Sequence, residues 1–319
     1  MSYIQTVSGA LPPEHLLFCH CHEHLMISKG VSWTINPVLW IDDFEKTLDE
    51  LKSFSQNPGT FLVDAQPIGC NRMGEQLPLL AEQSGTEIIA STGFHKMIFY
   101  PNNHWIFQYD SSRLSDIFLH EIYQGMYIDC DNAAPSSYIS AKAGMIKCAL
   151  DTCGLNEQYK KLFDAAIIAA NTSGVPLMVH IEKGSDPIML ADYLEAQKMD
   201  LHRVIFCHLD RACANLEVHK RLCERGIYLE YDTIGRPKYH DDLVEAGIFT
   251  ALINYGFEDL LLFSLDTTRA RLKSYTPEGV GLNYIKDTFL PILRQKGVTT
   301  KQIQKISQKN CRQILSIQD

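Results

Sequence analysis

The sequence predicts an α/β protein in which eight parallel strands close into a (β/α)8 barrel, a TIM barrel, followed by a helical C-terminal tail. Eight short apolar runs alternate with longer amphipathic stretches along the whole chain, which is the pattern of repeated βαβ units. Several of these runs end in histidine or aspartate, and barrel enzymes carry their active sites at the C-terminal ends of the strands. An open doubly wound sheet is the alternative architecture, because it shares the same alternation.

The types and spacing of residues predict each strand and helix of this barrel. Runs rich in β-branched and other apolar residues predict strands at residues 16–21, 60–65, 87–92, 145–149, 176–180, 203–208, 227–232 and 260–266. Apolar residues at helical spacing predict helices near residues 42–55, 73–84, 112–127, 156–172, 187–199, 215–225 and 240–255. In the fourth of these, Tyr159, Leu162 and Phe163 begin an apolar stripe and Gly174 follows as a stop. Residues 283–296 are expected to form the eighth helix and residues 301–316 the tail.

We expect residues 1–319 to form one barrel domain. A rule of about 150 residues per domain would give two domains, but barrels of roughly 250 residues or more are single domains. No linker, low-complexity tract or internal repeat is visible. The longest interruption, residues 96–143, follows the third strand and is rich in aromatic residues. We expect it to form a lid or wall of the pocket, or to pack as a plain insertion.

The composition limits the partners. Lysine and arginine number 29 against 38 acidic residues, a formal charge of −9, so we expect a small-molecule substrate, no nucleic acid and no membrane. Residues 1–13 lack the features of a signal peptide and no apolar run approaches the ~18 residues of a membrane span, which favours the cytoplasm. The ten cysteines are scattered and expected to stay reduced. A homodimer is compatible with these observations. No nucleotide-binding fingerprint is present, so we expect no nucleotide cofactor.

The densest chemical signal is His20-Cys21-His22-Glu23-His24, at the end of the first strand. Residues two apart in a strand point to the same face about 6–7 Å from each other, so His22 and His24 can both reach one metal. A lone His-x-His pair is as often a pair of core or surface histidines. A zinc finger using the nearby cysteines is a weaker interpretation, because no second pair completes four ligands.

Three further strands end in residues of the same type: His180, His208 and Asp266. Each alone could cap a loop, but their convergence with His22 and His24 in a barrel predicts a metal centre, since imidazole suits zinc, manganese or cobalt.

Lys147 lies inside the apolar fourth strand, where an ammonium group would need a charge partner. A lysine at such a position is more often a Schiff-base nucleophile or an ion-paired core residue. Beside four histidines we favour a third role, in which the amine reacts with carbon dioxide and the anionic carbamate binds metal.

The sequence resembles the phosphotriesterase family of the amidohydrolase superfamily almost from end to end. The matching motifs are Cys21-His22-Glu23-His24-Leu25, Ser91-Thr92-Gly93-Phe94, Gly144-Met145-Ile146-Lys147, Val179-His180, His208-Leu209-Asp210-Arg211, Ser264-Leu265-Asp266 and Asn310-Cys311-Arg312. The resemblance implies two divalent metal ions, zinc in first place with manganese or cobalt as alternatives. It assigns His22, His24 and Asp266 to the α metal, His180 and His208 to the β metal, and carboxylated Lys147 as the bridge. Asp266 would also be catalytic, taking a proton from the attacking hydroxide and passing it to the leaving group.

The loops after the last two strands carry Arg236, Lys238, Arg269 and Arg271, and such loops in barrels frequently bind phosphate. Lys238 and Arg269 look like the phosphate-binding residues of the phosphorylated sugar-lactonase branch of the family. The resemblance therefore implies a hydrolase that opens a phosphorylated sugar lactone. The alternatives are a phosphotriesterase, a non-phosphorylated lactonase, an amide hydrolase, or a non-catalytic metal-binding or regulatory barrel.

Overall fold

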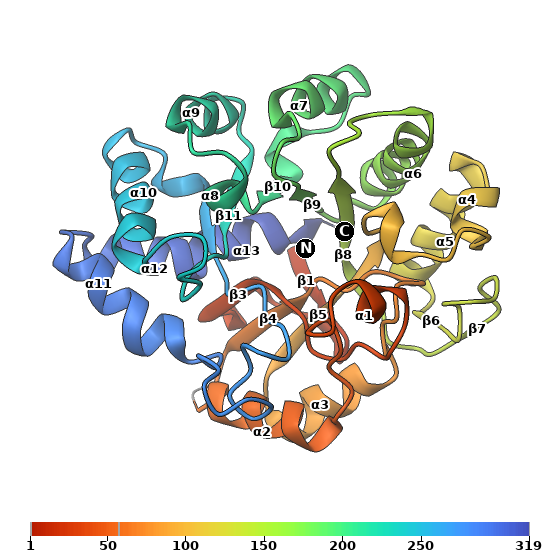
Figure 1. Cartoon of the computed structure of the whole chain (residues 1–319), viewed down its shortest axis with the longest axis horizontal. Helices are drawn as coiled ribbons and strands as arrows, with labels where there is room; N and C mark the ends of the chain where they lie inside the picture. Colours follow the sequence, from red (N-terminus) through yellow and green to blue (C-terminus); the bar gives the residue numbers. More distant parts are fainter. Residues whose placement is uncertain (1, 57, 319) are drawn as a thin grey trace.

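Eight short apolar segments lie side by side in chain order and form the parallel wall of a barrel, seen nearly end-on in Figure 1. The structure is a computed structural model that describes residues 2–56 and 58–318. The wall consists of β3 (Phe18–Glu23), β4 (Thr60–Asp64), β5 (Glu87–Gly93), β8 (Ala143–Leu150), β9 (Leu177–Ile181), β10 (Val204–Cys207), β11 (Tyr228–Tyr231) and β12 (Leu261–Phe263). The predicted TIM barrel is confirmed, and all eight predicted strands are present within a few residues.

The barrel is completed where its first and last strands meet. The hydroxyl oxygen of Ser264 accepts a hydrogen bond from the backbone N–H of His22 at 2.6 Å, and the N–H of Asp266 donates to the carbonyl oxygen of His22 at 3.1 Å. These bonds do not form a regular ladder, but they hold the ends of β3 and β12 together. The alternative of an open doubly wound sheet is therefore wrong.

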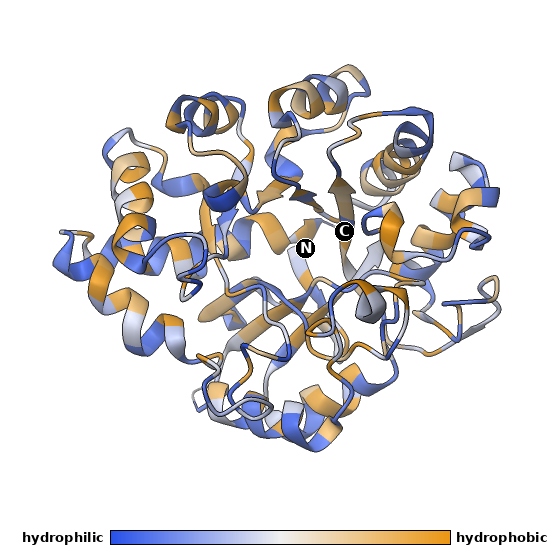
Figure 2. Ribbon diagram, in the orientation of Figure 1, coloured by the Kyte–Doolittle hydropathy of each residue, from blue (hydrophilic) through white to orange (hydrophobic). Residues whose placement is uncertain are grey.

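Helices surround the strands, and their apolar sides face the sheet (Figure 2). The main ones are α2 (Phe44–Phe54), α3 (Gln76–Ser84), α5 (Ser111–Tyr123), α6 (Glu157–Ser173), α7 (Pro187–Ala196), α9 (Leu216–Glu224), α10 (Asp242–Asn254) and α11 (Leu290–Gln295). Helix α6 begins where the Asn156 side chain accepts the N–H of Tyr159 at 2.9 Å, and it ends at Gly174, whose φ is +72°. Within the described residues, none of the helices has the length and apolarity of a membrane span.

The shorter helices lie mainly in loops and in the tail. They are α1 (Val31–Ile35), α4 (Trp105–Gln108), α8 (Leu209–Ala212), α12 (Thr300–Gln304) and α13 (Asn310–Leu315), the 3-10 turns η1 (Pro13–His15), η2 (Met97–Phe99), η3 (Leu201–Arg203) and η4 (Glu258–Leu260), and the π-helical turns η5 (Ile285–Phe289) and η6 (Lys305–Lys309). The predicted helical tail is confirmed, as a succession of α12, η6 and α13.

A feature that the sequence did not predict closes the floor of the barrel. The strands β1 (Ser2–Thr6), β2 (Gly9–Leu11) and β13 (Ile317–Gln318) form a small antiparallel sheet that joins both ends of the chain. Ile4 of β1 and Cys311 of α13 belong to the apolar cluster inside the barrel, together with Met145 and Met178. The backbone of β1 comes so close that a Cβ atom on Gly144 would lie 2.3 Å from the carbonyl oxygen of Gln5.

The insertion at residues 96–143 contains η2, α4, α5 and the two-stranded ribbon β6 (Tyr127–Ile128) and β7 (Ser137–Tyr138). Lys96 and Phe99, at its start, line the cavity described below. Farther along, Glu121 of α5 pairs with the buried Arg72 at 2.5 Å. The insertion therefore supplies part of the pocket wall and also packs against the outside of the barrel.

Candidate metal centre and substrate cavity

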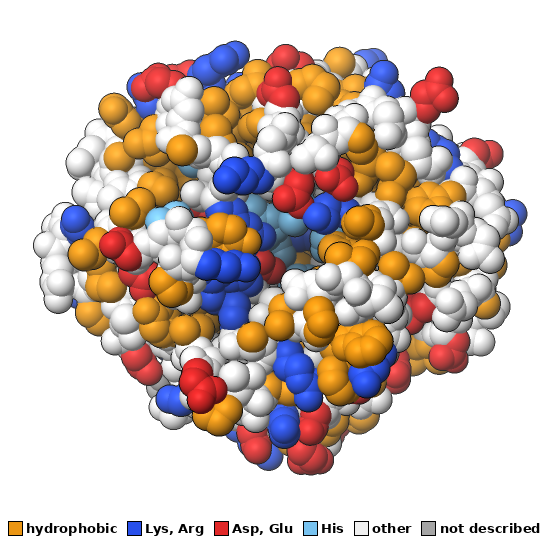
Figure 3. Space-filling view, viewed as in Figure 1, with side chains coloured by type: hydrophobic (Ala, Val, Ile, Leu, Met, Phe, Trp, Pro, Cys, Tyr) orange, Lys and Arg blue, Asp and Glu red, His pale blue; other side chains and the backbone are white. Residues whose placement is uncertain are grey.

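A cavity of about 750 Å³ opens at the C-terminal end of the barrel. Figure 3 looks into this hollow, where pale blue histidine side chains lie at the bottom and lysine and arginine gather beside it. The residues at its floor are His22, His24, His180, His208 and Asp266. The size falls in the range of pockets that enclose small organic ligands.

His22 and His24 reach the cavity because β3 is irregular. Cys19 and Cys21 point into the barrel, so strict alternation would turn His22 outward. The register between β3 and β4 shifts between His20 and Glu23, which reverses the alternation at this point. Glu23 consequently lies with His20, 2.7 Å from its Nδ1, and the two histidines face inward.

Lys147 and His180 need no such irregularity, since each stands two residues beyond an inward methionine. Lys147 is fully buried, and its amine lies 3.0 Å from Nε2 of His22 and 3.7 Å from the sulfur of Met178. Gly93 of the neighbouring strand makes room for this part of β8. A Cβ atom at Gly93, where φ is +99°, would lie 2.0 Å from the carbonyl oxygen of Lys147.

His208 and Asp266 follow their strands with backbones in the left-handed region. Their φ values are +68° and +48°, which are uncommon for residues other than glycine and cluster at functional sites. Cys207 points into the barrel, so a continued strand would turn His208 outward. The left-handed turn at His208 directs its ring back into the cavity, where the centroids of the His208 and His22 rings lie 4.8 Å apart.

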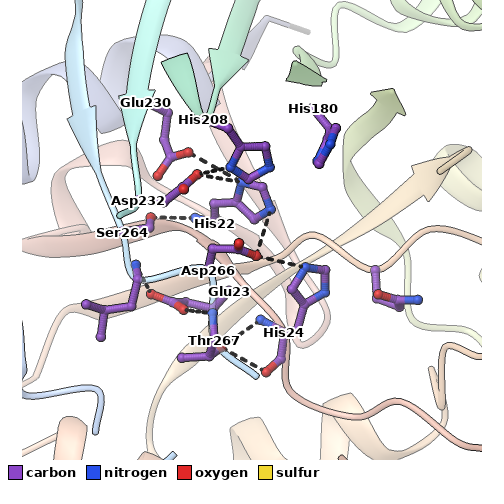
Figure 4. A network of polar contacts seen from close by, with 12 residues as sticks. His22, Glu23, His24, His180, His208, Glu230, Asp232, Ser264, Asp266 and Thr267 are labelled. Carbon is purple, nitrogen blue, oxygen red and sulfur yellow. Dashed lines mark hydrogen bonds and ion pairs between the residues drawn. The ribbon is translucent and has the colours of Figure 1, made fainter. Parts of the chain in front are cut away.

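The structure brings all six predicted ligands together, and Figure 4 shows five of them: His22, His24, His180, His208 and Asp266. One carboxylate oxygen of Asp266 lies 3.5 Å from Nε2 of His24 and 3.8 Å from Nε2 of His22. The rings of His180 and His208 have centroids 4.4 Å apart. Lys147 connects to the group through its contact with His22.

These residues fit a metal centre in their chemistry. Burial holds the pKa of His22 well below its ordinary value, and burial lowers the pKa of His180 to about 4. Burial likewise lowers the pKa of His208. Burial opposes ionisation of Asp266, but Arg236, His24 and Arg211 outweigh it and hold the pKa of this carboxyl well below its usual range. Neutral imidazoles beside a carboxylate are the protonation states that metal binding requires.

Sequence analysis missed two buried carboxylates behind the histidines. Glu230 lies 3.3 Å from Nδ1 of His22, and Asp232 lies 2.5 Å from Nδ1 of His208 (Figure 4). Such carboxylates orient histidine ligands and leave Nε2 free to bind. The signal was present, because polar residues at positions 230 and 232 alternate within an otherwise apolar strand.

Glu23 is a third buried carboxylate near the proposed ligands, and it acts on the backbone around Asp266. It accepts the backbone N–H groups of Leu265 and Thr267 at 2.9 and 3.0 Å. It thereby fixes the backbone on both sides of Asp266.

The cationic residues of the last two loops occupy different places. Arg236 lines the cavity and lies 3.0 Å from the Asp266 carboxylate, which Arg211 also contacts at 3.1 Å. Lys238 lines the cavity with its amine over the ring of Tyr239, 4.7 Å from the centroid. Arg269 and Arg271, in the loop after β12, form their contacts mainly with other protein groups.

Arg269 does not line the cavity. Its guanidinium lies over the Trp40 ring at 4.0 Å, donates to the carbonyl oxygen of Trp40 at 3.2 Å and lies 3.7 Å from Asp42. Arg271 reaches the cavity wall but donates to the carbonyl oxygens of Ile234 and Gly235. The two arginines therefore brace the loops in this structure.

A second cluster of charged and titratable side chains forms another part of the cavity wall. Glu182 lies 2.5 Å from the amine of Lys96 and 3.1 Å from Nε2 of His180. The ring of His95 also lies near His180, with centroids 5.5 Å apart. Both His95 and Lys96, which follow β5, line the cavity.

Comparison with known proteins agrees with this geometry. The model of the phosphotriesterase family matches residues 2–315. A phospho-furanose lactonase of Mycoplasmopsis agalactiae is 26% identical, over 99% of this chain and 92% of the relative. An N-acetyltaurine hydrolase of Homo sapiens is 25% identical, over 98% of this chain and 97% of the relative.

Solved structures share the fold. An amidohydrolase from Mycoplasma synoviae superposes with a TM-score of 0.94 at 25% identity, over 100% of this chain and 93% of that one. A lactonase from Listeria monocytogenes superposes with a TM-score of 0.88 at 22% identity, over 99% of this chain and all of that one. The curated relatives described above are named as a lactonase and a hydrolase, which confirms the predicted enzyme class.

Proposed function

The chain belongs to the phosphotriesterase family and is a hydrolase, and we propose that it opens a phosphorylated sugar lactone at a binuclear metal centre. The observation that carries this proposal is the convergence of five ligand-type side chains on the floor of one cavity, with the buried amine of Lys147 3.0 Å from His22 and with Lys238 in the cavity wall. Similarity to phospho-furanose lactonases along nearly the whole chain supports the substrate class.

We propose that His22, His24 and Asp266 hold one ion, His180 and His208 the second, and carboxylated Lys147 both. The ions are zinc, with manganese or cobalt as alternatives. When bound, they would supply Lewis acidity and lower the pKa of a water molecule enough to give hydroxide near neutral pH. Residues 1–319 would act as one catalytic domain.

Lys147 and Asp266 would carry the proton chemistry of the chain itself. The neutral amine of Lys147 would attack carbon dioxide and release a proton, forming an N–C bond and an anionic carbamate. A buried ammonium among histidines is costly, and no ion pair to Lys147 is found within residues 2–56 and 58–318, which supports the modified form. Asp266 would take the proton of the nucleophile and give it to the alkoxide oxygen as the ring ester opens.

We propose that Lys238 and Arg269 bind the substrate phosphate, at a distance from the ester carbonyl. The Lys238 amine is suited to this because no hydrogen bond or ion pair engages it among the described residues. Arg269 would have to turn from Trp40 and Asp42 towards the cavity. Binding energy from these contacts would orient the lactone ring.

The test compares a phosphorylated five- or six-membered sugar lactone with its dephosphorylated form. Lys238→Ala and Arg269→Ala should each lower kcat/KM for the phosphorylated substrate by about ten- to hundredfold, because charge-assisted contacts contribute roughly 1.5–3 kcal/mol. Hydrolysis of the dephosphorylated lactone should change little, and the exposed Lys301→Ala serves as the control.

Two results would contradict the phosphate assignment. One is a wild-type enzyme that prefers the dephosphorylated lactone. The other is an equal loss on both substrates in a variant, which would give that side chain a structural role, as its packing against Trp40 allows for Arg269.

An amide substrate is the second candidate. It is favoured by the N-acetyltaurine hydrolases among the relatives, which match 98% of this chain. Assaying N-acetyltaurine beside the lactones decides between the two, since a higher kcat/KM for the amide would replace the lactone proposal and leave the metal centre intact.

A further inference from the structure

A second cluster of metal-binding residue types lies behind the loop that joins β11 to α10. It consists of Asp210 in α8, His240 in the loop and Glu245 in the first part of α10. One ligand atom from each of these side chains lies within 4.8 Å of the others. None of the three belongs to the six residues of the proposed binuclear centre.

Glu245 is the unusual member of this cluster. Its side chain is fully buried, yet neither carboxylate oxygen has a hydrogen-bond donor among the described residues. Burial, together with the charges of Asp210, Asp232 and Asp242, raises the pKa of Glu245 well above its ordinary value. A buried carboxyl group surrounded by other acids needs either a bound proton or a cation close by.

The contacts of His240 indicate where that proton or cation would lie. Its Nδ1 lies 3.2 Å from the carbonyl oxygen of Asp241, which can only accept, so Nδ1 carries the ring proton. Nε2 of the neutral ring then presents a lone pair, yet it lies 3.1 Å from a carboxylate oxygen of Glu245. Two lone pairs that face each other at this distance need a cation or a proton between them.

Thr233 and Asp210 complete the set of candidate metal ligands. The Thr233 hydroxyl donates its proton to Asp210, so the lone pairs of its oxygen are free, and this oxygen lies 3.4 Å from Nε2 of His240. Asp210 is 6% exposed, and its carboxylate also accepts the backbone N–H groups of Asp232 and Thr233 at 2.9 and 2.7 Å.

We propose that Asp210, His240 and Glu245, with the hydroxyl of Thr233, bind a divalent cation distinct from the binuclear centre. One imidazole nitrogen with carboxylate and hydroxyl oxygens is a donor set suited to zinc or manganese. The ion would fasten α8 and α10 to the loop between β11 and α10. That loop carries Arg236 and Lys238 into the substrate cavity, so the ion would stabilise the cavity wall.

The test counts and locates zinc in the full-length protein. The protein is stripped with chelator, reloaded with zinc and bicarbonate, and freed of excess ion before elemental analysis. We expect three zinc ions per chain in the wild type and two in Glu245→Gln. Glu217→Gln, which removes an exposed carboxylate of α9, should retain three. Crystals measured at the zinc absorption edge should show an anomalous peak between His240 and Glu245.

If Glu245→Gln fails to fold, His240→Ala tests the same ion at a partly exposed position and should also lose that peak. Peaks at His22 and His208 with none at Glu245 would overturn this proposal, leaving a His240 imidazolium to neutralise Glu245. A peak at Glu245 with one ion or none among the six cavity ligands would instead overturn the binuclear centre. The two proposals therefore fail separately.

Discussion

The amine of Lys147 is buried 3.0 Å from a histidine nitrogen, so its chemical state decides what the cavity can bind. Lys147→Ala removes the proposed carbamate and should lower metal content and reduce activity by at least about 100-fold, since even indirect partners of metal ligands contribute 10- to 100-fold. Acetate or propionate should restore part of both, because a small carboxylate can take the place of the carbamate. Elemental analysis and lactone hydrolysis with and without the acid measure this.

The exposed Lys160→Ala is the matched control and should keep full metal content without added acid. Full activity of Lys147→Ala would show that Lys147 is not the bridge. Metal loss without any rescue would leave the lysine as a ligand support whose carboxylation is unproven, so mass measurement of the intact wild type in bicarbonate is the decisive complement.

How far individual site residues could be predicted depends on local backbone geometry. Lys147 and His180 follow from strand alternation alone, since each continues the inward side of an apolar strand. His22 and His208 are inward only because of a register shift and a left-handed turn, which periodicity does not contain. Their position at strand ends still identified these two as candidate ligands, but neither that position nor the resemblance to a family could supply the side-chain partners that hold Arg269 outside the cavity.

At the scale of elements, the strands were predictable because buried parallel strands are short apolar runs with polar ends. The small sheet of β1, β2 and β13 was not, because its strands are only two to five residues long and β13 pairs with β1 across more than 300 positions of sequence. The eighth helix was predicted as continuous but is divided into η5 and α11. Pro291 explains the division, since it lacks the N–H that would bond one turn back, and the backbone widens to a π-turn before it.

The short helix α4 depends on a histidine cap that should respond to acid. Nδ1 of His104 accepts the backbone N–H of Ile106 at 3.2 Å, and burial lowers the pKa of His104 to about 4. The unfolded chain binds this proton near pH 6.5, so the stabilising effect is complete above that pH. It is lost as the pH falls from about 6.5 to about 4, because the unfolded state then binds a proton that the folded state does not.

Urea unfolding of wild type and His104→Asn over pH 4–8 measures this effect. Asparagine keeps a capping oxygen and does not titrate, so the free energy of unfolding of the variant should fall less between pH 6.5 and 4. Parallel pH profiles for the two proteins would contradict the assignment, and the His104 ring resonance followed by NMR gives its pKa directly.

On the scale of the whole molecule, segments that are distant in sequence meet at both ends of the barrel. Its floor is closed by both chain ends, where Arg312 of α13 donates to the carbonyl oxygens of Leu16 and Glu14 at 2.7 and 2.9 Å. At the opposite end the six proposed ligands come from β3, β8, β9 and the segments that follow β3, β10 and β12. Ions bound there would connect strands that are distant in sequence.

Metal binding should therefore stabilise the entire barrel, because the ligands come together only in the folded chain. Each site at a free-ion concentration of 100 times its Kd adds about 2.7 kcal/mol to the free energy of unfolding. Chelator-treated protein should melt several degrees below the zinc-loaded form, and zinc should restore the melting temperature. Magnesium should not, since it prefers oxygen ligands to imidazole. The double variant His22→Ala, His208→Ala should lose most of the zinc response, whereas an unchanged response in that variant would place the stabilising ion outside the cavity.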